Sequence, residues 1–242
     1  MKKRVRASRV LRLLRRDALQ ALRHMRAWFS RRWAVVAAGA SAALVCIWLA
    51  APMDAVVIAK VRALNESARQ WMRVAQMFSY WGDFLGLNLI AFVTLQAAGW
   101  ARRSRALMRA AAAGLLCAFL AGLTANALRL MTGRPRPSTQ MRDRLHGPSL
   151  STKMHALPSA HVATAFGGAL PVLLSHPAAG VPLTLCAAAV GWSRLQLDRH
   201  HMTDELVSVL IAMLFAVPLS QWARDGRPGD GKTSDFRNRR RP

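Results

Sequence analysis

Six apolar segments, each close to the length needed to cross a lipid bilayer, constrain the fold of this chain more than any other feature. A helix crosses the hydrocarbon core with about 17 to 25 apolar residues. The segments cover residues 33–50, 84–100, 107–128, 158–175, 181–197 and 204–222. The fourth and fifth contain polar groups, which are costly at that depth and should face a cavity lined by protein. We therefore predict an all-α fold, a six-span integral membrane helical bundle.

The charge of the chain is large and unevenly placed. The formal net charge is +24, while 53% of the residues are hydrophobic, a combination that argues against a soluble nucleic-acid-binding protein. Twelve of the 35 Lys and Arg residues lie in residues 1–32 and seven lie in residues 223–242. Long apolar segments between basic ends are typical of a membrane protein.

This pattern divides the chain into a basic arm (1–32), a six-span domain (33–222) and a basic tail (223–242) that we expect to be disordered. The arm carries an apolar helical face. Such a helix could lie on anionic lipids, or the arm could be only a block of charge that fixes the topology. The apolar face consists of Leu11, Leu14, Ala18, Leu22, Met25 and Phe29.

The basic residues also predict the orientation. If the N-terminus is cytoplasmic, the cytoplasmic segments carry 23 of the 35 basic residues. Both termini are then cytoplasmic. The expected location of the protein is the inner (plasma) membrane of a bacterium. The loops that follow the third and fifth spans lie on the opposite side, facing the periplasm or the cell exterior.

Three polar clusters lie at the ends of these spans. They read RLMTGRPRPS (129–138), LPSAHVATAF (157–166) and SRLQLDRHHMTDE (193–205). Two crossings separate the loop after the third span from the loop after the fifth, so all three clusters should meet on one face. None of the clusters supplies enough carboxylate, Cys or His ligands at metal-site spacing, so we expect no metal and no other cofactor.

The clusters are suited to binding phosphate. Guanidinium groups match phosphate oxygens in a planar, bidentate way. Pro158 and Ser159 predict the start of a helix, whose free N–H groups would point at an anion. The arginines concerned are Arg129, Arg134, Arg136, Arg194 and Arg199.

The order and spacing of the clusters resemble the three motifs of the type 2 phosphatidic acid phosphatase family, K-x6-R-P, P-S-G-H and S-R-x5-H-x3-D. The resemblance covers about residues 80–222 when the spans are included. Arginine replaces the usual lysine of the first motif, and alanine replaces the glycine of the second. Here the motifs read Arg129-x6-Arg136-Pro137, Pro158-Ser159-Ala160-His161 and Ser193-Arg194-x5-His200-x3-Asp204.

The resemblance implies a mechanism without metal. One histidine attacks phosphorus and forms a phospho-histidine, and a second protonates the leaving oxygen. It assigns these roles to His200 and His161, with Asp204 as the partner of His200. The resemblance implies that the phosphoryl oxygens are held by Arg129, Arg136, Ser159, Ala160 and Arg194.

Two adjacent histidines compete for the nucleophilic role. The spacing from Ser193-Arg194 selects His200, and the spacing to Asp204 selects it again. On a helix, Asp204 would share a face with His200 and accept a proton from one ring nitrogen, leaving the other as the nucleophile. His201 fails the first spacing, and we expect it to be a hydrated interfacial side chain. No role is assigned to Arg134, Asp198, Arg199, Glu205, His146 or His155.

The expected substrate is a membrane lipid phosphate or diphosphate, and polyprenyl diphosphate is the leading candidate. Phosphatidate, phosphatidylglycerol phosphate and lipid A remain alternatives, as does transfer of the phosphoryl group to another lipid. A catalytically silent lipid transporter is the non-enzymatic alternative. Anionic lipids are the expected partners of the basic arm, and nucleic acid is not expected. The sequence predicts no oligomeric state.

Overall fold

The structure is a computed structural model that describes the backbone of residues 2–67, 70–82 and 84–225; the side chains of residues 2–15, 66–67 and 84–85 are not described. These parts contain helices and no strand, which confirms the all-α prediction. The helices are α1 (Lys2–Leu49), α2 (Met53–Ser67), α3 (Gln70–Trp81), α4 (Leu89–Ala101), α5 (Arg105–Thr132), α6 (Ala160–Ser175), α7 (Pro177–Gln196) and α8 (Met202–Arg224). A π-helical turn, Phe84–Asn88, precedes α4, and two 3₁₀ turns, Pro137–Thr139 and Thr152–Met154, lie between α5 and α6.

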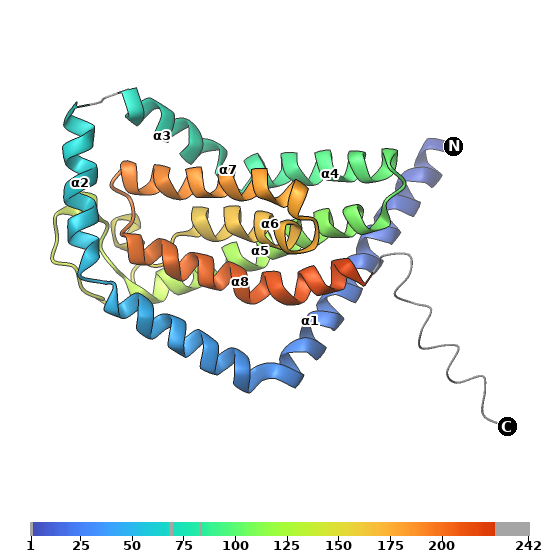
Figure 1. Ribbon diagram of the computed structural model, residues 1–242, viewed down its shortest axis with the longest axis horizontal. Coiled ribbons are helices and arrows are strands. Elements are labelled where there is room, and N and C mark those ends of the chain that lie inside the picture. Colours follow the sequence, from blue (N-terminus) through green and yellow to red (C-terminus); the bar gives the residue numbers. More distant parts are fainter. Residues whose placement is uncertain (1, 68–69, 83, 226–242) are drawn as a thin grey trace.

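The centre of the molecule is a bundle in which α6 packs against α5, α7 and α8 (Figure 1). Small residues line the contacts, which lets the helix backbones approach closely. A Cβ atom added at Gly114 of α5 would lie 2.6 Å from the carbonyl oxygen of Gly168 of α6, so glycine is required there. Other small buried residues in this core are Ala113, Cys117, Ala121, Ala163, Ala212 and Ala216.

Four helices, α1, α5, α7 and α8, are long and apolar enough to cross a membrane. Helices α3 and α4 together make a fifth candidate, bent by 57° at the break between them. Helix α6 is apolar but has only 16 residues, which is short for a full span. The six predicted segments therefore fall on helices, while the count of six spans stays a prediction.

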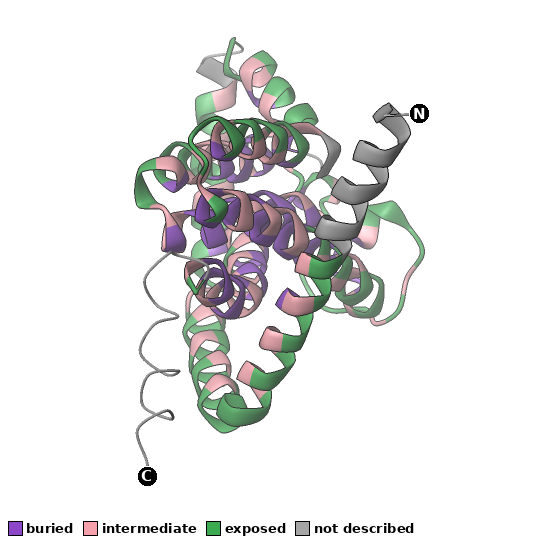
Figure 2. Cartoon of the chain, turned by 90° about the vertical axis from the view of Figure 1, so that its right-hand side faces the viewer, coloured by how far each residue is buried: buried purple, intermediate pink, exposed green. Residues whose placement is uncertain are grey.

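Helix α1 bends near its middle, so that its two halves run in different directions (Figure 1). Its N-terminal half packs on the bundle through Ala21, which is buried together with Trp222 and Ala223 at the end of α8. Its C-terminal half is largely exposed, as expected for a segment that faces lipid (Figure 2). The side chains of Leu11 and Leu14 on the predicted apolar face, and residues 226–242 of the predicted tail, lie outside the described residues.

The segment between the first two predicted spans forms α2 and α3, and α2 runs across one end of the bundle (Figure 1). The Arg62 side chain of α2 donates to Asp198 Oδ2 at 2.7 Å and to the carbonyl oxygen of Pro137 at 3.0 Å. The Asn65 side chain donates to the carbonyl oxygen of Gln196 at 3.0 Å. These contacts hold α2 against the first motif, at Pro137, and against the third motif, at Gln196 and Asp198.

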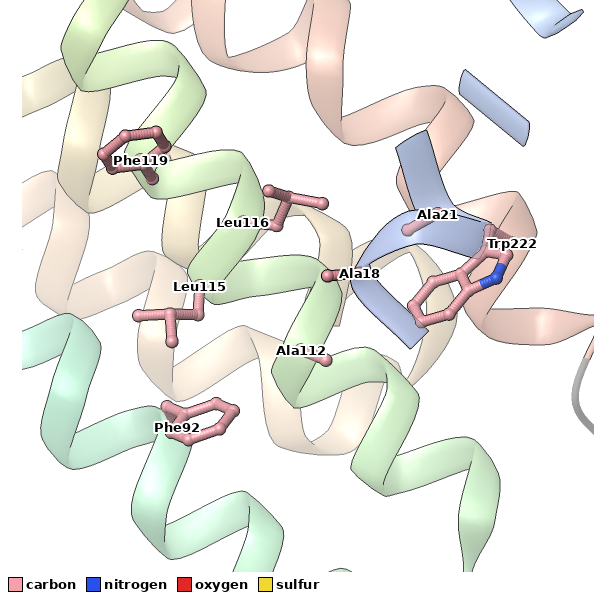
Figure 3. Close-up of a pocket in the computed structure, with 8 residues that line it drawn as sticks. All are labelled: Ala18, Ala21, Phe92, Ala112, Leu115, Leu116, Phe119 and Trp222. Carbon is pink, nitrogen blue, oxygen red and sulfur yellow. The ribbon is translucent and has the colours of Figure 1, made fainter. Parts of the chain in front are cut away.

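A cavity of about 370 Å³ lies between α1, α4, α5 and α8 (Figure 3). It sits near the C-terminal end of α8, away from the motif loops, and its lining offers a phosphate no charged partner. It is lined by Ala18, Ala21, Phe92, Ala112, Leu115, Leu116, Phe119 and Trp222.

Candidate active site

The three predicted clusters meet at one end of the bundle. The Nδ1 atom of His200 lies 2.7 Å from the carbonyl oxygen of Ala156. The backbone N–H of Ser159 donates to Ser208 Oγ of α8 at 2.8 Å. The loop before α6 therefore contacts the start of α8. This agrees with the prediction that two membrane crossings separate the two segments and bring them to the same side.

His200 is buried and lies in the short non-helical segment before α8. A carbonyl oxygen can only accept a hydrogen bond, so Nδ1 carries the proton and donates to Ala156. Burial, followed by the nearby charge of Arg194, holds the pKa of His200 well below its ordinary value. The ring is therefore neutral, with an unprotonated Nε2 available as a nucleophile.

The predicted hydrogen bond between His200 and Asp204 is wrong. His200 Nδ1 lies 3.9 Å from Asp204 Oδ2, because α8 begins only at Met202 and His200 does not share its helical face. Asp204 instead accepts the backbone N–H of His201 at 2.7 Å, and its Oδ2 lies 3.1 Å from His201 Nδ1. The Ala156 carbonyl thus fixes the tautomer of His200, and Asp204 is an electrostatic neighbour.

The prediction for His201 is also wrong. It is the N-cap residue of α8 and is only 4% exposed, not hydrated. One ring nitrogen approaches Asp204, and the other lies 3.7 Å from Asp143 Oδ2. Since both nitrogens face carboxylates of the protein, the ring is turned away from the nucleophilic role.

Cationic and polar donors surround His200. Arg194, Arg136 and His161 all lie within electrostatic range of its ring, and Arg136 lies within range of Arg129. Among the described residues, the buried Nε atoms of Arg129 and Arg136 have no hydrogen-bond partner. Buried donors are normally satisfied, so these groups are suited to receive an anion.

Ser159 is the N-cap residue of α6, so the helix begins at Ala160, two positions later than Pro158 had suggested. Its Oγ is buried and, within the described parts of the chain, caps no backbone N–H and has no other partner. The N–H group of Ala160 lies in the first helical turn, where no partner exists within the helix. The Ala160 methyl packs into the apolar core, so alanine in place of glycine leaves this N-terminus open to an anion.

Arg194 is held from a helix outside the three motifs. Its Nη1 donates to Ser79 Oγ of α3 at 2.5 Å. Sequence reasoning missed Ser79, which lies 115 residues from its partner. Its only sequence signal was a polar residue in the otherwise apolar stretch MFSYW.

A second group of charged residues lies beside His200. Arg134, which lies at no signature position of the motifs, pairs with Asp204, Asp54 and Asp143 at 2.6 to 2.9 Å. Since the chain has only 11 acidic residues, Asp54 at the end of an apolar segment was a usable signal. Within the described parts of the chain, no group of three or more His, Cys, Asp or Glu side chains is arranged to hold a metal ion.

Comparison with known families now identifies the fold. The model of the PAP2 superfamily matches residues 110–228, which contain all three clusters. Through these residues the chain belongs to the PAP2 superfamily. The predicted family resemblance is thereby confirmed, and this PAP2 protein is a membrane phosphatase for lipid-type phosphate substrates. No curated protein and no solved structure matches the chain.

The family match leaves part of the site unexplained. Helices α1 to α4 precede residue 110, so Asp54 and Ser79 come from outside the matched region. Both contact arginines within it, Arg134 and Arg194. The PAP2 bundle of this protein is therefore completed by side chains from its own N-terminal helices.

Proposed function

We propose that this PAP2 protein removes a phosphoryl group from a membrane lipid through a phospho-histidine on His200, without a metal ion. The observation that carries the proposal is the hydrogen bond from His200 Nδ1 to Ala156, which leaves Nε2 unprotonated. At the same end of the bundle lie the N-terminus of α6 and the Nε atoms of Arg129 and Arg136, which have no hydrogen-bond partner among the described residues. Phosphoryl transfer depends mainly on such positioning and on charge around the equatorial oxygens.

The first step forms a bond between His200 Nε2 and phosphorus while the bond from phosphorus to the lipid oxygen breaks. His161, at the second position of α6, gives a proton to the leaving oxygen. In the second step water attacks the phospho-histidine, and His161 takes up its proton as inorganic phosphate leaves. Arg129, Arg136 and Arg194 bind the equatorial oxygens throughout.

Asp204 has an electrostatic part in this scheme. Phosphorylation at Nε2 while Nδ1 keeps its proton makes the imidazole ring positive. The Asp204 carboxylate, 3.9 Å from Nδ1, opposes that charge without taking the proton. The Ala156 carbonyl holds the ring in place during the same step.

The proposed substrate is a lipid diphosphate, with a polyprenyl diphosphate as the first choice. Its head group would reach the site while its tail stays in the bilayer. Helix α1 begins, and α8 ends, at the end of the bundle away from the site (Figure 1). Together with the basic arm, this supports cytoplasmic termini and a site that faces the periplasm or exterior of a bacterial cell.

The basic arm would contribute to membrane binding. Between residues 16 and 32, α1 exposes five arginines, while Ala21 packs against the protein. Exposed arginines next to a membrane span attract anionic lipids. The arginines concerned are Arg16, Arg23, Arg26, Arg31 and Arg32.

A substrate panel tests the proposal directly. The purified protein is offered polyprenyl diphosphate, phosphatidate, phosphatidylglycerol phosphate, lipid A and a soluble phosphomonoester, with and without EDTA. We expect a lipid to be hydrolysed at least about tenfold more efficiently than the soluble ester, because the bilayer confines its head group beside the site. Activity should persist in EDTA and be inhibited by vanadate.

Three outcomes would count against this assignment. Equal turnover of the soluble ester would contradict the assignment of a lipid substrate. A requirement for added magnesium contradicts the phospho-histidine route. Phosphate recovered on a second lipid, and not in water, identifies a transferase.

A further inference from the structure

Every nitrogen of the Arg134 guanidinium donates to a side chain of the protein. Its Nε and Nη2 donate to the two oxygens of Asp143 at 2.7 and 2.6 Å. Nη2 also donates to Asp54 Oδ2 at 2.9 Å. Nη1 donates to Thr203 Oγ1 at 2.8 Å and to Asp204 Oδ1 at 2.6 Å. All its nitrogens therefore face protein groups, and none is directed to a substrate.

The charges around Arg134 explain why it is needed. Asp204 is fully buried and Asp54 nearly so, while the Asp143 side chain is 43% exposed. A buried carboxylate stays ionised only with a paired cation and hydrogen bonds. Arg134 is the guanidinium that both buried carboxylates share.

Asp54 ties this cluster to the start of α8. Its Oδ1 accepts the backbone N–H of Thr203 at 3.0 Å, and its Oδ2 accepts the Thr203 hydroxyl at 2.5 Å. A residue of α2 thus satisfies an N–H in the first turn of α8, where a negative charge is favourable. The same turn carries Asp204, so Asp54 fixes the turn through Thr203 while Arg134 binds the Asp204 carboxylate.

We propose that Arg134, held by Asp54 and Asp143, is a positioning residue that pairs with the Asp204 carboxylate and fixes it beside His200. The carboxylate then stabilises the positive imidazole that forms when phosphorus bonds to Nε2. This role rests on the phospho-histidine route proposed above. It predicts that Arg134 acts on the transition state and not on the binding of phosphate, because its nitrogens donate to Asp54, Asp143, Thr203 and Asp204.

The test compares two inhibitors on the full-length protein in detergent or lipid. Vanadate forms a five-coordinate species on a histidine and so reports the charge developed on His200, whereas inorganic phosphate reports ground-state binding. Inhibition constants do not depend on how much of a preparation is folded, so loss of folded protein alone leaves both unchanged. The variants are Arg134→Gln, Arg134→Lys and Asp54→Asn.

Arg62→Gln is the matched control, because Arg62 also anchors α2 through an ion pair but does not contact Asp204. We expect Arg134→Gln to raise the inhibition constant of vanadate about tenfold or more and that of phosphate less than about twofold. Asp54→Asn should raise the inhibition constant of vanadate about threefold. The vanadate constant of Arg134→Lys should lie between those of Arg134→Gln and the wild type. Arg62→Gln should change neither constant by more than about twofold.

The outcomes separate this inference from the proposed function. A wild-type enzyme that vanadate does not inhibit contradicts the phospho-histidine route itself. If vanadate inhibits the wild type and its inhibition constant is unchanged in both Arg134→Gln and Asp54→Asn, the role of Arg134 is overturned. If Arg134→Gln does not fold, Asp54→Asn and Arg134→Lys decide, and an unchanged vanadate constant in both overturns it.

Discussion

The Nδ1 atom of His200 donates a hydrogen bond of 2.7 Å to the carbonyl oxygen of Ala156. This contact joins the loop before α6 to the segment before α8, and so joins the second motif to the third. A backbone carbonyl cannot take up a proton as a carboxylate can. The tautomer of the proposed nucleophile is therefore set by the fold and not by a second titrating group.

Replacing His200 by alanine should abolish phosphate release, because the nucleophile is lost. His201→Ala should retain measurable activity, although it removes a contact to Asp204 and should lower the rate by about tenfold. Steady-state phosphate release by purified, folded protein measures both. His146→Ala, in an exposed loop, is the control and should behave as the wild type. If His200→Ala is active and His201→Ala is inactive, His201 and not His200 is the nucleophile.

The lowered pKa of His200 predicts a pH dependence of stability. The ring stays neutral in the folded state but takes up a proton in the unfolded chain below about pH 6.5. Stability is thus fully present above that value and falls as the pH drops below it, by up to about 1.4 kcal/mol per pH unit. Asp143, whose pKa is lowered mainly by its hydrogen bond from Arg134, loses its contribution only below the ordinary carboxyl range.

Thermal unfolding between pH 8 and pH 5 measures this effect. The wild type should lose more stability over that interval than His200→Gln, which cannot be protonated. Parallel curves for the two proteins would show that His200 does not titrate differently on unfolding. Activity of the wild type should show no loss near pH 6.5 that can be assigned to the nucleophile.

Ser79→Ala tests how Arg194 is held. Removing the hydroxyl leaves Arg194 Nη1 without this partner and lets the guanidinium move away from the phosphate. We expect KM for the lipid to rise by about three- to tenfold with a smaller change in kcat. Ser30→Ala is a suitable control, since Ser30 is exposed and its hydroxyl donates to the carbonyl oxygen of Ala27 in its own helix. An unchanged KM in Ser79→Ala would show that Arg194 is positioned without α3.

The predicted orientation can be measured with reporters. A fusion after Pro242 should read as cytoplasmic, and an insertion within residues 138–156 should read as external. The reason is the excess of basic residues at the two ends of the chain. The reverse pattern would place the site on the cytoplasmic face and contradict the charge argument.

The sequence predicted the parts of this structure that depend on local pattern. Apolar segments matched the helices, and parity of the crossings placed Ser159 beside the start of α8. It could not predict pairs such as Asp54 with Arg134, which lie 80 residues apart and meet only when α2 folds across the bundle. No spacing rule encodes a contact of that kind.

The error at His200 has a local cause. Treating residues 200 to 204 as helical placed His200 and Asp204 on one face. In the structure α7 ends at Gln196, and Asp198 adopts a left-handed conformation with φ of 55°. Aspartate tolerates this conformation better than most residues, so the chain turns and His200 approaches Ala156 instead.

The short length of α6 has a consequence for how this enzyme would meet its substrate. Sixteen residues extend about 24 Å, whereas the hydrocarbon core is about 30 Å thick. If the turn at His176 lies at one membrane boundary, Ser159 lies several ångströms beneath the other. A head group would then have to be drawn inward from its own leaflet, and a thicker bilayer would require a longer descent. We therefore expect the thickness of the host membrane itself to set part of the reaction rate, through hydrophobic mismatch around the helix that carries His161.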